Sequence, residues 1–101
     1  MEMTRKTEGS KLTIKLGGEM HAKEAEEFKA AFHEEIEANP GISDITLDLN
    51  DLKYVPSSGL RVFLEIARYI GGRGSIRTVG VSDEVMETFD MTGIGRYLNI
   101  I

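Results

Sequence analysis

The residues best suited to chemistry stand in one short stretch, Val55-Pro56-Ser57-Ser58-Gly59. Proline fixes its own φ and keeps the preceding residue extended, so Pro56 separates a strand from the element that follows. A helical pattern begins directly afterwards and places Ser57 at the start of a helix. A serine hydroxyl there accepts a hydrogen bond from the free backbone N–H groups, and such an N-cap stabilises a helix by about 1 kcal/mol.

A second interpretation gives the Ser57 hydroxyl a chemical role, as a phosphate acceptor. A phosphate at this position would lie among free N–H groups at the positive end of the helix dipole, so the folded chain would accommodate it. A partner protein docked over the same surface would not, because the negative charges would enter a desolvated interface. The residues alone leave capping and switching open for Ser57.

Other catalytic or metal-binding arrangements find little support in the sequence. Cysteine is absent, which excludes thiol nucleophiles, disulfides and the usual structural zinc sites. His21 has no orienting third group and no Gly-x-Ser-x-Gly turn to act on, so hydrolase activity is disfavoured. Asp48, Asn50 and Asp51 lack the spacing of a calcium loop. We therefore expect no enzyme activity, no catalytic residues, no metal and no cofactor.

Composition narrows the class of protein further. The chain has 101 residues, 41% of them hydrophobic and 29% charged, which predicts one globular domain over residues 1–101. Its net charge of −5 disfavours nucleic acid and an anionic membrane surface as partners. The polar N-terminus shows no secretory signal, and no apolar run is long enough for a membrane helix. The absence of cysteine is compatible with a reducing cytosol.

Two periodicities predict the elements that position the serine loop. Apolar residues alternate with polar ones in the expected strands, and they recur every three or four positions in the expected helices. Strands are predicted at 4–8, 11–16, 44–50 and 75–81, and helices at 22–39, 58–70 and from 83 onward. Residues 97–101 add a short strand or a last turn. This order predicts an α/β fold with a mixed sheet of four or five strands and helices packed on it.

Strand-end loops carry function in such sheets, and the loop at residues 51–58 links the third predicted strand to the second predicted helix. The helix after this loop has Arg61, Glu65 and Arg68 on one stripe. We expect Arg–Glu pairs there that contribute a few tenths of a kcal/mol each, roughly. Docking to an acidic patch of a partner is the alternative for this stripe.

Three segments in the right order resemble the STAS domain family, the sulphate-transporter and anti-sigma-factor-antagonist family. Residues 45–60 are similar to its signature, Gly18-Glu19-Met20 to an early Gly-Glu-Leu, and Phe89-Asp90-Met91-Thr92-Gly93-Ile94 to a late Phe-Asp-Met-Ser-Gly-Leu. The likeness covers almost the whole chain.

The resemblance implies a cytoplasmic bacterial anti-sigma factor antagonist that regulates transcription. Such proteins bind an anti-sigma factor that is also a serine kinase, and binding ends when the kinase phosphorylates the first serine of the motif. A phosphatase reverses the modification, and magnesium and ATP belong to the kinase. That serine corresponds to Ser57 here, and the expected partner-binding residues are Tyr54, Val55, Pro56, Ser57, Ser58, Gly59, Arg61 and His21.

Two positions depart from the family pattern. Pro56 stands where the family commonly has aspartate before the acceptor, and His21 stands where it has aspartate after Gly-Glu-Leu. These changes remove carboxylates that would orient the hydroxyl or contact the kinase. Two further hypotheses therefore stay open: a non-phosphorylated STAS scaffold subunit of a transport or stress-signalling complex, and an anion- or nucleotide-binding module that uses the helix N-terminus.

Overall fold

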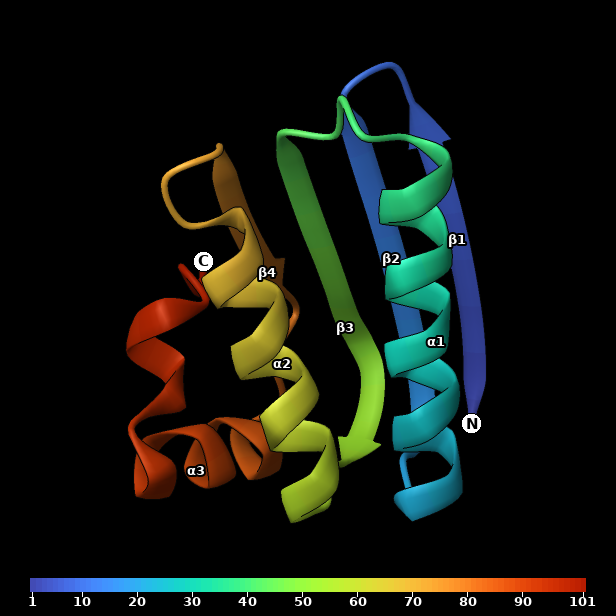
Figure 1. Cartoon of the computed structure of the whole chain (residues 1–101). Helices are drawn as coiled ribbons and strands as arrows, with labels where there is room; N and C mark the ends of the chain where they lie inside the picture. Colours follow the sequence, from blue (N-terminus) through green and yellow to red (C-terminus); the bar gives the residue numbers. More distant parts are fainter.

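A four-stranded sheet in the order β1-β2-β3-β4 is the frame of the protein, which a computed structural model describes over residues 1–101 (Figure 1). Three α-helices and one short 3-10 helix, η1, accompany the sheet. The elements in chain order are β1 (Glu2–Glu8), β2 (Lys11–Glu19), α1 (Ala22–Ala38), β3 (Asp44–Tyr54), α2 (Ser57–Ile70), β4 (Ser75–Val79), α3 (Asp83–Thr92) and η1 (Ile94–Tyr97).

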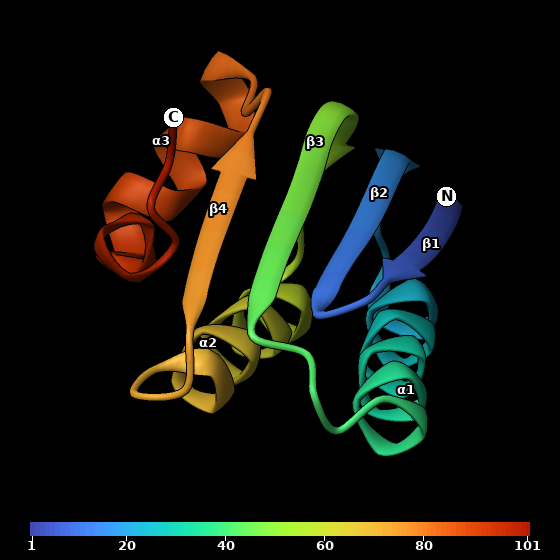
Figure 2. The same cartoon turned by 90° about the horizontal axis from the view of Figure 1, so that it is seen from above.

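The sheet is mixed, as predicted, and it has four strands. β1 and β2 form an antiparallel hairpin, whereas β2, β3 and β4 run parallel. The parallel strands follow one another in one direction across the sheet, so right-handed crossovers place their helices on the same face. Figure 2 shows α1 and α2 together on that face, with α3 beside β4.

The core lies between this sheet face and the helices. The inward-facing apolar residues of the two central strands are buried, and they are Leu12, Ile14, Leu16, Ile45, Leu47, Leu49 and Leu52. Aromatic rings join the three helices: Phe28 of α1 lies 5.1 Å from Phe63 of α2, which lies 5.4 Å from Phe89 of α3, between centroids. The opposite sheet face carries polar side chains, as expected for a sheet with one solvated face.

The central strand β3 is longer than the alternation predicted. It continues past Asn50 to Tyr54, because the register between β2 and β3 shifts after Lys15 and pairing resumes at Gly17 and Asp51. Asn50 and Asp51 are both exposed, so the period of two breaks there. The predicted loop at 51–58 therefore shrinks to two residues, Val55 and Pro56.

The C-terminal residues cover the edge of β4. Gly93 ends α3 in the left-handed conformation (φ 73°), and η1 follows. Ile100 then pairs with Thr78 in a parallel bridge, while the Thr78 hydroxyl donates to the Leu98 carbonyl at 2.8 Å. The segment at 97–101 thus supplies the end of a turn and one bridge, which protects an otherwise open strand edge.

Candidate functional site

The ends of β2, β3 and β4 meet at one edge of the sheet, where α1, α2 and α3 begin (Figure 1). A backbone hydrogen bond ties two of these connections together, since Met20 N donates to Tyr54 O at 3.0 Å. The helix starts place His21, Ser57 and Ser82 along this edge. It is the edge at which open α/β sheets usually bind their ligands.

Ser57 is the first residue of α2 and not its cap. The N-cap is Pro56, in an extended conformation (φ −81°, ψ 170°), and no side chain caps this helix. The N–H groups of Gly59 and Leu60 donate to the Pro56 carbonyl at 2.9 and 3.0 Å. The predicted capping role of Ser57 is therefore wrong: the helix begins one residue earlier than expected. The Ser57 side chain is exposed and takes no part in capping.

Gly59 lets α2 approach the sheet closely beneath Ser57. A Cβ on Gly59 would lie 2.6 Å from Met20 Sδ and 2.9 Å from Val55 Cγ1. Met20 is completely buried and Val55 is only 4% exposed, so neither can move aside into solvent. This packing fixes where Ser57 stands. It also means that Val55 and Gly59 face the core, so any part they play in partner binding is indirect.

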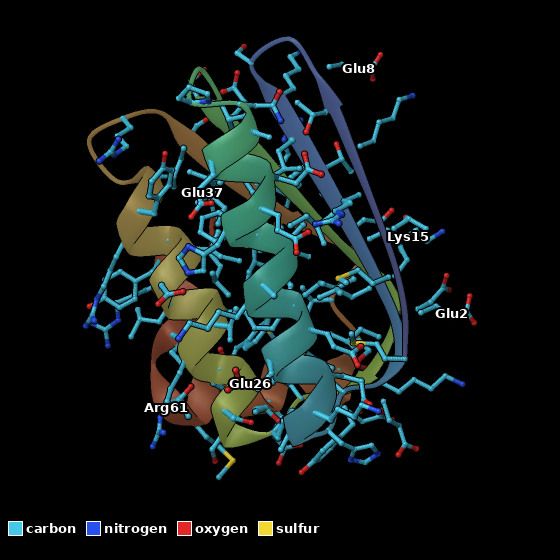
Figure 3. All side chains as sticks on the ribbon, turned by 45° about the vertical axis from the view of Figure 1, so that its right-hand side comes forward. Glu2, Glu8, Lys15, Glu26, Glu37 and Arg61 are labelled. Carbon is cyan, nitrogen blue, oxygen red and sulfur yellow. The ribbon has the colours of Figure 1, made fainter.

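The remaining predicted site residues reach the surface to different degrees. His21, Tyr54 and Arg61 are exposed, and Pro56 and Ser58 are half-buried. The rings of His21 and Tyr54 lie 5.8 Å apart, and His21 Nε2 lies 3.3 Å from Glu19 Oε1. Figure 3 shows Arg61 pointing away from the ribbon of α2. The structure thus gathers an imidazole, a phenol and a guanidinium near the start of α2.

His21 also holds the start of α1. Its backbone N–H donates to Glu24 Oε1 at 2.9 Å, while its carbonyl accepts from Ala25 N. The backbone of His21 thus organises a helix terminus, and its imidazole contacts Glu19 and Tyr54. The His21 ring makes no hydrogen bond to the Ser57 hydroxyl, the contact that a general base would use.

The polar residues Asp48, Asn50 and Asp51 of β3 form local hydrogen bonds and an ion pair. Asn50 N–H donates to the Asp48 carboxylate at 3.1 Å, which holds the pKa of that carboxyl below its usual range, with smaller help from the Asn50 amide and Lys15. Lys15 pairs with Asp51 at 3.6 Å. No group of three His, Asp or Glu side chains is arranged to hold a metal ion.

The predicted Arg–Glu pairs along α2 do not form. Glu65 instead contacts His33 of α1 at 2.9 Å, so this carboxylate joins two helices. Arg61 and Arg68 are exposed and belong to none of the ion pairs of the protein. The sequence carried no signal for the His33–Glu65 contact, because it depends on how α1 and α2 lie side by side.

The sequence matches the model of a known protein family over nearly its whole length. A family model described as "Mlab, STAS domain" matches residues 3–101. The chain belongs to the STAS domain family. None of its helices combines the length and apolar character needed to cross a membrane.

Solved structures of anti-sigma factor antagonists share the architecture. Unphosphorylated SpoIIAA aligns with a TM-score of 0.83 at 20% identity, covering 99% of this chain and 88% of that one. Phosphorylated SpoIIAA from Bacillus gives 0.75 at 20% identity, with coverage of 99% and 91%. An anti-sigma factor antagonist from Mycobacterium paratuberculosis gives 0.84 at 13% identity, with coverage of 98% and 83%. At these identities the likeness establishes the fold.

Proposed function

We propose that this protein is a regulatory binding module of the anti-sigma factor antagonist type. It docks onto an anti-sigma factor that is also a serine kinase, and phosphorylation of Ser57 ends the complex. The observation that carries the proposal is the Ser57 side chain, exposed at the first position of α2 and unused in capping. Membership of the STAS family and the fold shared with SpoIIAA, which is known in both phosphorylation states, support it.

The surroundings of Ser57 suit a phosphate in the free protein. The first turn of α2 has no acidic residue, so the positive end of the helix dipole is not neutralised from within. Arg61 lies four positions further on, which is one helical turn along the same face, and has no carboxylate partner. Modification would therefore leave the fold intact and change only what the surface can bind.

A docked partner would experience the same phosphate differently. Tyr54, 49% exposed, and Arg61 are residue types that dominate binding energies at protein interfaces. Ser57 stands close to both in the chain, so a partner that covers them desolvates its hydroxyl. A phosphate there brings about two negative charges into a water-poor interface, which weakens the complex.

A scaffold that is never phosphorylated is the second candidate. Two positions favour it, because each lacks an aspartate that the family commonly has. Pro56 stands directly before Ser57, and His21 follows Gly18-Glu19-Met20. The same surface would then bind a partner permanently. An anion-binding module would differ again, since it would need no protein partner.

Binding to the anti-sigma factor kinase encoded nearest to this chain tests the proposal. Isothermal titration would compare wild type, Ser57→Ala, Ser57→Asp and Ser10→Asp, the last placing the same charge in the distant β1–β2 turn. We expect Ser57→Asp to weaken binding by about tenfold or more, and the other two variants to bind within about twofold of wild type.

Each of the other results counts against part of the proposal. Equal affinities for all four forms would remove the switch and favour the scaffold. No binding by wild type, combined with a thermal shift on adding phosphate or nucleotide alone, would favour the anion-binding module.

A further inference from the structure

A groove of about 480 Å³ lies at the far end of α2 from Ser57, between the C-terminal half of this helix and η1. Most of its wall is apolar, formed by Leu64, Ala67, Ile70, Ile76, Ile94 and Tyr97. Tyr97 is 54% exposed, and nearby Met91, next to the lining residue Thr92, is 80% exposed. Large apolar side chains that remain in solvent around a concave surface mark a binding site more often than isolated ones do.

Arginines stand around this groove without carboxylate partners. Arg68 is the only charged residue that lines it. Arg96 directly precedes the lining residue Tyr97. Neither Arg68 nor Arg96, which we call the basic rim, takes part in an ion pair, whereas Arg5 pairs with two glutamates of α1.

An aromatic ring holds Arg96 in place, whereas Arg73 stands on the other side of α2. The Arg73 guanidinium lies 4.6 Å from the centroid of the Tyr69 ring, which packs on Phe32 of α1 and not on the groove. The Arg96 guanidinium lies 5.8 Å from the centroid of the Tyr97 ring, which lines the groove. Arg96 Nε also donates to the Gly93 carbonyl at 3.2 Å. Such stacking leaves the edge N–H groups of a guanidinium free to bind carboxylates.

We propose that this groove docks an acidic amphipathic helix of a partner protein. The wall from Leu64 to Gly71 is about 10 Å long at 1.5 Å per residue, which matches two turns of a bound helix. Apolar side chains at positions i, i+3 or i+4, and i+7 of that helix enter the groove, and its glutamates meet the basic rim. The charge of the rim selects an acidic ligand over a basic one.

A protein helix fits this site better than an anionic membrane does. A flat anionic bilayer would face a wide part of the surface of this chain, whose net charge is −5, whereas a bound helix faces only the groove and its rim. The acidic residues of α1, among them Glu26 and Glu37 in Figure 3, lie on the helix beside α2. The site is also concave, and so accepts single side chains of a ridge more readily than a flat lipid surface.

The groove is separate from the Ser57 surface. Ser57 and Ile70 stand at opposite ends of α2, about 20 Å apart along its axis. The inference therefore does not depend on the proposed function, and the protein can hold one ligand at each end of this helix.

A designed peptide probe tests the groove directly. The probe is a fluorescein-labelled peptide of about 14 residues, with leucines at i, i+3, i+4 and i+7, glutamates only at the few positions that would meet the rim, and alanines elsewhere to favour a helix; it is compared with the same peptide carrying lysines for glutamates. Anisotropy is expected to show saturable binding of the acidic peptide alone, weakened about tenfold or more by Arg68→Glu. Arg77→Glu is the matched control, because Arg77 is exposed on the other sheet face, and binding should not change.

Amide shifts of the labelled protein locate the contact. Shifts confined to residues 64–76 and 92–97 support the proposal, and shifts centred on Ser57 overturn it. Failure of the acidic peptide to bind, equal binding of both peptides, or equal loss in Arg68→Glu and Arg77→Glu also overturns it. Binding to phosphatidylglycerol vesicles that is lost in Arg68→Glu, without binding of the acidic peptide, would assign the groove to a membrane surface instead.

Discussion

Two helices begin beside a serine at the same edge of the sheet, and they use it differently. At the start of α3, Ser82 is the N-cap, and its hydroxyl accepts a hydrogen bond from Val85 N at 3.2 Å. At the start of α2, Ser57 already lies inside the first turn, and Pro56 occupies the cap position. One hydroxyl is committed to the fold and the other is available to a partner or an enzyme.

The difference follows from how each helix is anchored. α3 has ten residues and buries only Val85 and Phe89, so the cap and the acidic residues of its first turn matter to its stability. α2 buries six residues along its length, beginning with Gly59 and Leu60 in its first turn. Packing therefore holds the start of α2 without help from a serine side chain.

The largest effect is expected where α2 packs most tightly. Gly59→Ala places a methyl group 2.6 Å from Met20 Sδ, so it should lower the free energy of unfolding by about 1–3 kcal/mol in urea denaturation. Gly41→Ala is the matched control, because nothing lies within 4 Å of the added Cβ, and it should change stability little. Similar losses in both variants would mean that close packing does not anchor α2.

Truncating the two serines should separate their roles. Ser82→Ala should lower the free energy of unfolding by about 1 kcal/mol, since it removes the hydrogen bond to Val85 N. Ser57→Ala should change it by less than about 0.5 kcal/mol, as for a surface position. Paired thermal or urea melts measure both values, and an equal loss at Ser57 would show that its hydroxyl does cap α2.

The smallest effect concerns the bend of β3 that leads to Ser57. Because the Asn50 N–H lowers the pKa of Asp48, this carboxylate stabilises the fold above its ordinary pKa of about 4, and that stabilisation fades as the pH falls through the lower folded value. Solvent screening limits it to roughly a few tenths of a kcal/mol. Asp48→Asn should therefore flatten the loss of stability on acidification below about pH 4, and an unchanged acid profile would contradict this.

Local patterns were enough to predict the architecture. The alternation of Leu12, Ile14 and Leu16 and the helical spacing of Phe28 and Phe32 depend on burial on one face, which a single sequence shows directly. The extension of β3 to Tyr54 could not be predicted in this way, because a register shift against β2 breaks the alternation.

The sequence was enough to predict where the candidate site lies in the chain, but not its geometry. Whether Ser57 is a cap or a first helical residue is a difference of one position, which backbone angles decide and residue types do not. The contact of Gly59 with Met20 and that of His33 with Glu65 join segments far apart in the chain. Such contacts depend on how the helices and strands pack together, and a single sequence does not show which distant residues come into contact.

Site-resolved mass spectrometry tests the central claim, that the free hydroxyl of Ser57 is the one a kinase uses. The chain would be incubated with the anti-sigma factor kinase encoded nearest to it, magnesium and ATP, and the modified residue identified by fragmentation. We predict a single phosphate on Ser57, none on Ser82, and none at all in Ser57→Ala. A stable complex with the kinase that never transfers phosphate to Ser57, or a phosphate on Ser82 instead, would contradict the account.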